Sequence, residues 1–307
     1  MADAQTTATL APRADTGGDG GFDRTLIAVV GGPQETNREL VDAWLSHDLP
    51  AALVAPSEAP FLLQPGDVAL GRIDVLPSLD GVEQGLDELD QLERSGVRVL
   101  NSSVALLRAH DKLLTSQRLV AAGLPHPKTA LLESQDAPLD VDLPLVLKPR
   151  FGSWGKDVYR CATKRELRAV FREIRDRPWF VAQGALVQEL VPPTGYDLRL
   201  LVAAGQVVGA VRRVAAPGDW RTNLALGSSR EPVLPSAAEC RLGIAAAAAL
   251  GTDFVGVDLL PTSGGYVVIE LNGAVEFNEL YGLDGRDLYL ELAGALGLRT
   301  WATVGAH

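Results

Sequence analysis

Two apolar stretches, FVGVDLL at residues 254–260 and YVVIELN at residues 266–272, decide the fold of this chain. Both are rich in β-branched residues, and the PTSGG segment between them is typical of a turn, so we expect a β-hairpin. Glu270 and Asn272 are two residues apart and should project from the same face of their strand. Asp258 should lie opposite Glu270 or one pairing step away. Three such oxygen donors suit Mg²⁺, although a polar outer face of an antiparallel pair would show the same pattern.

The composition is that of a globular protein with more than one domain. A length of 307 residues predicts two or three domains, and 47% of the residues are hydrophobic. The net charge of −11 argues against a nucleic-acid or anionic-membrane partner. The two cysteines and four histidines form no zinc or redox motif, and no apolar run reaches the ~18 residues of a membrane span.

The chain begins with a small, polar, glycine-rich segment at residues 1–23. It lacks the positively charged start and apolar core of a secretory signal, so we expect a disordered tail and a cytoplasmic protein.

A strand–helix–strand pattern follows the tail. RTLIAVVGG (24–32) is a buried-strand run, NRELVDAWLSHD has helical periodicity, and AALVA supplies a second strand. We therefore expect a parallel α/β domain over residues 24–100. GGPQETN lacks the third glycine of a dinucleotide fingerprint, and Gly155-Lys156 is followed by Asp157, which excludes a Walker A loop.

The rest of the chain divides into two further segments. Over 101–186 we expect one linker helix (Asn101–Leu124) and a small lid domain. In the lid domain a strand, a glycine loop and a second strand should precede a helix that is capped by Thr163. Over 187–307 we expect a hairpin that turns at Ala204–Gly205, an alanine-rich helix from Ser236 to Gly251, the hairpin described above, and a last helix at 283–296.

Cationic and glycine-rich positions mark a binding site for phosphate. Lys148 ends an apolar strand, where it can hold a point charge against a phosphate or simply extend to solvent. The loop Gly152-Ser153-Trp154-Gly155 lets backbone N–H groups approach a phosphate and can act as a lid, although a plain hairpin turn would look similar. Several arginines can clamp phosphate or carboxylate, or form surface ion pairs: Arg199, Arg212, Arg213 and Arg221.

The order of these residues resembles the ATP-grasp superfamily, most closely its RimK/LysX group, over about 101–296. The motifs are Lys112, Lys148 with GSWGK, a Gln-Glu pair, Asp-x-Arg, WRTNLALG and Asp…Glu-x-Asn. The resemblance implies an ATP-grasp fold of the α/β (α+β) class with three domains, in which the nucleotide lies between two α+β domains.

The resemblance also implies a role for each matching residue. Lys112 and Lys148 would contact phosphates, Glu189 and Leu190 adenine, and Asp197 the ribose. The full implied ATP-binding set is Lys112, Lys148, Gly152, Ser153, Trp154, Gly155, Gln188, Glu189, Leu190 and Asp197. Catalytic roles fall to Arg221, Asn223 and Lys148, substrate binding to Arg199, Arg212, Arg213, Asn272 and Glu276, and metal binding to Asp258, Glu270 and Asn272.

The activity implied is an ATP-dependent carboxylate–amine ligase that forms an amide through an acyl phosphate. Its cofactors would be ATP and two Mg²⁺ ions, with Mn²⁺ as a substitute. Its partners would be an amino acid and a peptide, carrier protein or metabolite, and a homo-oligomer is compatible with the group. The alternatives are a phosphotransferase that acts on a hydroxyl and a nucleotide-binding module without catalysis. The segment after Asn272 reads Gly-Ala-Val-Glu-Phe-Asn, which is closer to LysX-type ligases, and Glu276 within it is expected to bind the amine or to act as a base.

Overall fold

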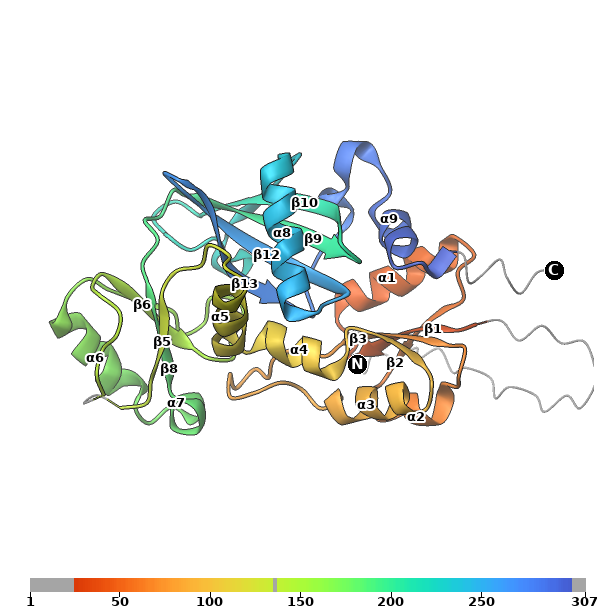
Figure 1. The fold of residues 1–307 in the computed structure, drawn as a ribbon, viewed down its shortest axis with the longest axis horizontal. Helices are drawn as coiled ribbons and strands as arrows, with labels where there is room; N and C mark the ends of the chain where they lie inside the picture. The colour runs from red at the N-terminus through yellow and green to blue at the C-terminus, as the bar shows by residue number, and fades with distance from the viewer. Residues whose placement is uncertain (1–24, 135–136, 300–307) are drawn as a thin grey trace, which may run out of the picture.

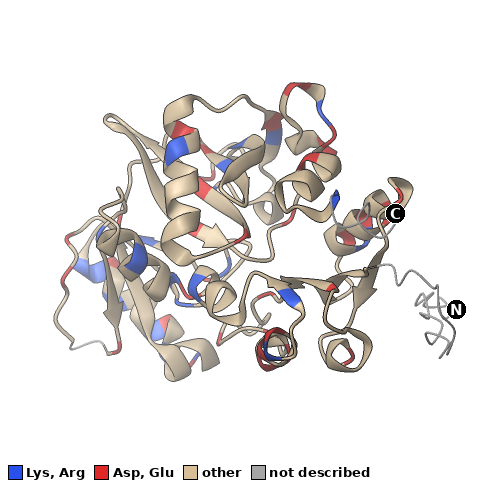
Figure 2. Ribbon diagram, turned by 45° about the vertical axis from the view of Figure 1, so that its right-hand side comes forward, with Lys and Arg blue, Asp and Glu red and all other residues tan. Residues whose placement is uncertain are grey.

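A computed structural model describes residues 25–134 and 137–299, so the expected tail at 1–23 lies outside the described residues. The described chain forms three sheets, which follow one another along the sequence (Figure 1). No helix in this part of the chain is long and apolar enough to cross a membrane. Acidic positions are spread over helices of all three regions rather than gathered in one segment (Figure 2).

The N-terminal sheet is parallel, as expected, with the order β2-β1-β3-β4. Alternate residues of β1 enter two cores: Ile27 and Val29 pack with helix α1 and with the C-terminal helix α9 (Leu288–Ala295), whereas Ala28 and Val30 pack with helix α3. Helices therefore cover both faces of this sheet, which is typical of the α/β class. Its elements are β1 (Ile27–Gly31), α1 (Glu35–Ser46), β2 (Ala51–Val54), α2 (Ala59–Leu62), β3 (Val68–Arg72), α3 (Leu86–Arg94) and β4 (Arg98–Leu100).

A second sheet, which we call the lid sheet, has the order β5-β8-β6-β7 and is antiparallel. Phe171 and Phe180 pack edge to face at 5.1 Å in the core beneath it. Strand β8 belongs to this sheet, so a division at 186/187 would cut the strand, and the chain leaves the sheet only after Glu189. Its elements are β5 (Thr129–Leu132), β6 (Leu145–Pro149), β7 (Tyr159–Cys161), α6 (Lys164–Ile174), α7 (Pro178–Gln183) and β8 (Ala185–Glu189).

The third sheet has the order β11-β10-β9-β12-β13. Alternate residues of β9 again face two cores, with Leu200 and Val202 toward α8 and Leu201 and Ala203 toward α9. The expected capping box at Ser236 and the left-handed Gly251 terminator bound α8. Its elements are β9 (Tyr196–Ala203), β10 (Gln206–Val214), η1 (Leu224–Leu226), β11 (Ser229–Pro232), α8 (Ala237–Leu250), β12 (Phe254–Thr262), β13 (Gly265–Asn272), η2 (Glu279–Tyr281), η3 (Leu283–Gly285) and α9 (Leu288–Ala295).

The hairpin of β12 and β13 is confirmed, and Asp258 pairs with Glu270 beside a β-bulge. The single helix expected at Asn101–Leu124 is wrong, because the chain breaks at Asp111 into α4 (Ser103–His110) and α5 (Lys112–Ala121). The Asp111 carboxylate caps α5 and also binds Arg150 at 2.7 and 2.6 Å. The last helix begins at Leu288 rather than 283, because Asp287 caps it and η3 precedes it.

Candidate active site

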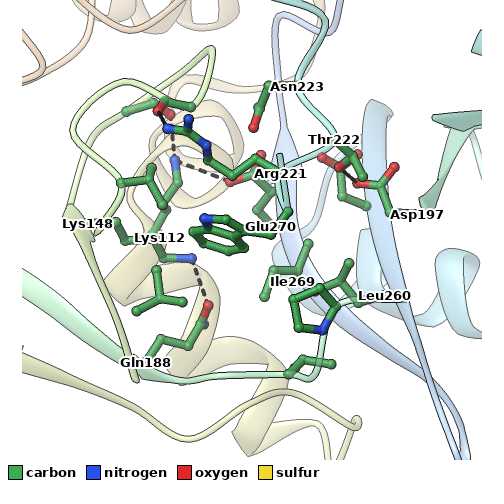
Figure 3. A pocket seen from close by; sticks show the side chains of 18 of the residues that line it. Lys112, Lys148, Gln188, Asp197, Arg221, Thr222, Asn223, Leu260, Ile269 and Glu270 are labelled. Carbon is green, nitrogen blue, oxygen red and sulfur yellow. Dashed lines mark hydrogen bonds and ion pairs between the residues drawn. The ribbon is translucent and has the colours of Figure 1, made fainter. Parts of the chain in front are cut away.

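A cavity of about 140 Å³ lies between the lid sheet and the third sheet (Figure 3). Side chains from β6 and β8 of the lid sheet, from β9, β10, β12 and β13 of the third sheet, and from the start of α5 and the connecting loops converge on it. It brings together the whole set of residues expected to bind ATP, namely Lys112, Lys148, Gly152, Ser153, Trp154, Gly155, Gln188, Glu189, Leu190 and Asp197. The expected catalytic residues Arg221 and Asn223 and the expected metal ligands Asp258 and Glu270 line it as well.

A second cavity, of about 410 Å³, shares part of its wall with the first. The shared side chains include Trp154, Arg213, Asn223 and Glu270. Three further residues expected to bind substrate line only this second cavity: Arg199, Asn272 and Glu276. A molecule in one cavity can therefore touch a molecule in the other, which a group transfer requires.

Lys148 is held inside the lid sheet. All five residues of β6 are buried, Lys148 is only 6% exposed, and its Nζ donates to Gln188 Oε1 at 2.8 Å. Gln188 is fixed in turn by a bond from its Nε2 to Thr129 Oγ1. Burial lowers the pKa of Lys148 to about 8, since the charged form loses its water. An anion in the cavity would stabilise this ammonium.

Lys112 reaches the same cavity because the helix break places it at the start of α5. Its Nζ donates to the carbonyl oxygen of Gly152 at 2.6 Å and lies 3.6 Å from Glu270 Oε2 (Figure 3). Two lysines and one carboxylate thus converge from three separate elements. This arrangement can bind a phosphate chain together with a cation.

The glycine loop is folded over the segment 221–223. Gly155 has a φ of +69°, and a Cβ there would lie 2.7 Å from Asn223 Oδ1. Arg221 Nη1 donates to the Gly155 carbonyl at 3.3 Å, and Trp154 Nε1 donates to Glu276 Oε1 at 3.4 Å. Only glycine allows this close approach, so the loop sequence determines how the cavity is covered.

Asp197 and Asp258 belong to a buried ion network on β9, β10 and β12. Arg199 binds both oxygens of Asp258 at 2.7 Å. Arg213 binds Asp197 at 2.8 and 2.5 Å and Asp258 at 2.8 Å. Burial would raise the pKa of Asp258, but the two arginines outweigh it and hold that pKa well below its usual range.

This network bears on two of the expected roles. Asp197 also accepts a bond from Thr222 Oγ1 at 2.6 Å, so the carboxylate expected to hold the ribose already has two partners. Asp258, expected to bind metal, is 1% exposed and can offer a cation only the lone pairs that its arginines leave. Spacing predicted the shared strand face of Asp197 and Arg199, but not these pairings.

Glu270 and Asn272 are better placed than Asp258 to bind a cation. Both project from β13, and within residues 25–134 and 137–299 the buried Asn272 Nδ2 has no hydrogen-bond partner. Because a half-turn of the amide exchanges its nitrogen and oxygen, Asn272 can present its oxygen at the same place. One carboxylate and one amide oxygen, completed by phosphate oxygens, are a donor set that Mg²⁺ accepts. In residues 25–134 and 137–299 no group of three His, Cys, Asp or Glu side chains could hold a metal.

Three other expected residues already have partners within the protein. Arg212 lines neither cavity: it stacks on Tyr196 at 4.9 Å and lies 3.9 Å from Glu231. The Leu190 N–H, expected to meet adenine, already donates to Pro144 O at 3.2 Å. Arg221 faces the first cavity but is paired with Asp219 at 2.9 Å.

Two residues that sequence reasoning did not select line the second cavity, Asp74 and His110. Asp74 follows the buried strand β3, and polar residues just past the carboxyl end of a parallel strand often line sites, which is the signal that could have found it. Burial lowers the pKa of His110 to about 4, and its Nε2 lies 2.8 Å from Ile73 O. This imidazole is therefore neutral near pH 7.

A family model described as RimK-like ATP-grasp domain matches residues 109–296, more than half of the chain. This chain belongs to the RimK-like ATP-grasp family. A probable alpha-L-glutamate ligase of Parasynechococcus marenigrum is 35% identical over 207 residues, which are 64% of this chain and 43% of that protein. The tetrahydromethanopterin:alpha-L-glutamate ligase of Methanosarcina acetivorans is 33% identical over 224 residues, covering 66% and 68%. The chain thus spans less than half of the first relative.

Solved structures confirm the ATP-grasp fold of this RimK-like protein. A RimK domain ATP-grasp protein from Sphaerobacter thermophilus superposes with a TM-score of 0.65 at 22% identity, covering 88% of this chain and 98% of the other. The ATP-grasp ligase PsnB, in complex with a phosphomimetic variant of its minimal precursor, Mg and ADP, gives 0.62 at 19% identity, covering 91% and 100%. The expected fold class, with a parallel N-terminal sheet followed by two antiparallel sheets, is confirmed.

Proposed function

We propose that this RimK-like protein is an ATP-dependent carboxylate–amine ligase that forms an amide through an acyl phosphate. The observation that carries the proposal is the shared wall of the two cavities. Lys112, Lys148 and Glu270 meet in the first, while Arg199 and Arg213 face the second. A phosphate donor and a carboxylate can therefore lie side by side.

In this proposal ATP occupies the first cavity. Lys112 and Lys148 bind its phosphates, and Glu189 with the segment that follows β8 contacts the adenine base. The glycine loop excludes water from the transferring phosphoryl group. Glu270 and Asn272 would hold Mg²⁺, and Asp258 would contribute at most one further oxygen. When bound, the ion neutralises phosphate charge. We also propose that a second Mg²⁺ ion binds and that Mn²⁺ can replace Mg²⁺.

The acid substrate would bind where the two cavities meet. Among the described residues, Arg199 and Arg213 each use Nε and Nη2 for their carboxylate partners, so their Nη1 groups are available to a second anion. An oxygen of the bound carboxylate attacks the γ-phosphorus, and ADP leaves with the electron pair of the broken P–O bond. Arg221 and Asn223 stabilise the charge of the transferring phosphoryl group.

The amide then forms at the activated carbonyl carbon. The neutral amine nitrogen attacks that carbon, the C–O bond to phosphate breaks, and inorganic phosphate leaves with the electron pair and takes up the proton that the nitrogen loses. The substrates we propose are an amino acid and a peptide, carrier protein or small metabolite. The names of the relatives make L-glutamate the first amino acid to test.

Trapping with hydroxylamine tests the proposed function. The protein is incubated with ATP, Mg²⁺, a panel of amino acids and peptides as acids, and hydroxylamine. An acyl phosphate yields a hydroxamate together with ADP. ADP without hydroxamate would indicate phosphate transfer to a hydroxyl, and tight ATP binding without ADP would indicate a non-catalytic module.

Binding of ATP is expected to weaken as the pH rises through about 8. Lys148 has a pKa of about 8 in the folded protein, and only its protonated form can neutralise phosphate. The dissociation constant for ATP should therefore rise about tenfold between about pH 7 and 9, as a single titrating group requires. Calorimetric titration at several pH values measures it. Lys148→Arg, which stays charged, should flatten the profile, and an unchanged slope in that variant would rule out Lys148 as its source.

Gly155→Ala is expected to lower kcat/KM for ATP by about tenfold or more, because its Cβ would strike Asn223 and hold the loop open. Gly205→Ala is the matched control: Gly205 also has positive φ (+77°), but a Cβ there meets nothing within 4 Å. Steady-state rates of ADP formation compare the two. Equal losses in both variants would show that backbone strain, rather than the contact with Asn223, matters.

A further inference from the structure

Two carboxylates from distant parts of the chain line the second cavity, one from the N-terminal region and one from the segment after β13. Asp74 comes from the segment after β3, and Glu276 comes from the segment after β13. The side chain of Asp74 accepts a hydrogen bond from the Val75 N–H at 2.7 Å, and Glu276 Oε1 accepts one from Trp154 Nε1 at 3.4 Å. Within the described chain, neither carboxylate forms an ion pair.

The other charges of this cavity are already balanced. Arg199 and Arg213 are paired with Asp258 and Asp197, and Glu270 lies 3.6 Å from Lys112. His110 is neutral, because burial lowers its pKa to about 4. The remaining charges are therefore those of Asp74 and Glu276.

One buried cation, Arg72, lies near Asp74 and Glu276 but forms no ion pair with either among the described residues. Arg72 is 2% exposed and donates to Asn37 Oδ1 at 2.9 Å and to Val275 O at 2.7 Å. Its Nη1 has no hydrogen-bond partner among the residues that the structure describes. It interacts with Asp74 and Glu276 only at longer range. Two carboxylates thus face one cation that touches neither. Burial raises the pKa of Asp74 to about 6, so this carboxyl is mostly ionised above pH 7.

We infer that Asp74 and Glu276 bind the incoming amine as its ammonium, so the second substrate of the reaction is a primary amine such as an amino acid. This inference rests on the proposed ligase function and adds the residues that recognise the nucleophile. The ammonium supplies the cation that the two carboxylates lack. Before the attack, one of these carboxylates accepts a proton from the ammonium, which frees the lone pair of the nitrogen. The shared wall at Glu270 and Asn223 then places the amine beside the carboxylate that ATP activates.

The Trp154–Glu276 bond connects the amine site to the glycine loop. Trp154 lines both cavities and has a φ of +57°, so the loop is held in an unusual conformation where it meets Glu276. An amine at Glu276 would therefore lie directly beneath the loop that covers the phosphates.

Partition between two nucleophiles tests the inference. A panel of the protein amino acids first identifies the amine that gives the most amide. This amine and hydroxylamine then compete for the same acyl phosphate. Hydroxylamine is neutral near pH 8 and needs no ammonium site. Asp74→Asn and Glu276→Gln are each expected to lower the ratio of amide to hydroxamate at least about tenfold. Asp74→Asn keeps an oxygen for the Val75 N–H, and Asp74→Glu should recover part of the ratio.

Asp42→Asn, an equal charge change on the exposed side of α1, is the matched control and should stay within about twofold of the parent ratio. A ratio for Asp74→Asn within twofold of the parent would overturn the inference while leaving the ligase function standing. If the parent forms neither product, the ligase function itself fails. Calorimetric titration of the same amino acids then decides the amine site: weaker binding in Asp74→Asn supports it, and equal binding overturns it.

Discussion

Replacing Glu270 by Gln is expected to reduce turnover by about 10³-fold while the fold is kept. Glu270 lies in the wall common to both cavities, 3.6 Å from Lys112, and is the carboxylate best placed to bring a cation to the phosphates. The neutral amide keeps the size of the side chain but loses the charge that binds Mg²⁺. ADP formation over a range of Mg²⁺ concentrations measures the loss.

Glu93→Gln is the matched control for this prediction. Glu93 is exposed on α3, away from both cavities, so its substitution should leave turnover close to the parent value. Thermal unfolding of both variants checks that the fold is kept. If Glu270→Gln retains more than about a tenth of the parent turnover, Glu270 does not hold the metal.

The second large effect concerns stability. Arg213→Met should lower the free energy of unfolding by about 4 kcal/mol, because it leaves Asp197 and Asp258 buried without their shared cation. Both carboxylates are at most 2% exposed, so water cannot replace the arginine. Urea unfolding followed by circular dichroism measures the change.

Arg212→Met, the neighbouring position on β10, supplies the comparison. Its side chain is 43% exposed and lies 3.9 Å from Glu231, and such surface pairs contribute less than about 1 kcal/mol. A loss in Arg213→Met no larger than that in Arg212→Met would show that the buried network does not stabilise the third sheet.

The sequence predicted what depends on local patterns. The hairpin of β12 and β13, the pairing of Asp258 with Glu270, and the limits of α8 follow from strand periodicity, turn residues and capping. These features need only neighbouring residues, so a single chain reveals them.

Features that depend on distant residues were missed or only partly predicted. At the helix break, Asp111 is paired with Arg150, which follows β6 and is about forty positions away in the chain. The ion network requires the register of β9 against β10 and β12, which pairs Arg213 with Asp197 and Asp258 with Arg199. Strand β10 follows β9 directly, but a β-bulge between Val207 and Gly209 shifts its register. Strand β12 follows only after α8, so packing sets its register against β9.

Asp74 shows the same limit at the site itself. Nothing within the segment 71–74 indicates that this residue will face Glu276, about two hundred positions later in the chain. Only the packing of the N-terminal region against the third sheet brings the two carboxylates to one cavity.

Isotope transfer tests the acyl-phosphate mechanism most directly. The acid substrate is labelled with ¹⁸O in its carboxylate, and the products are analysed by mass spectrometry after one turnover. An acyl phosphate predicts one ¹⁸O atom in the inorganic phosphate, with ADP as the nucleotide product. Recovery of the label in AMP, or unlabelled phosphate beside a newly formed amide, would contradict the mechanism.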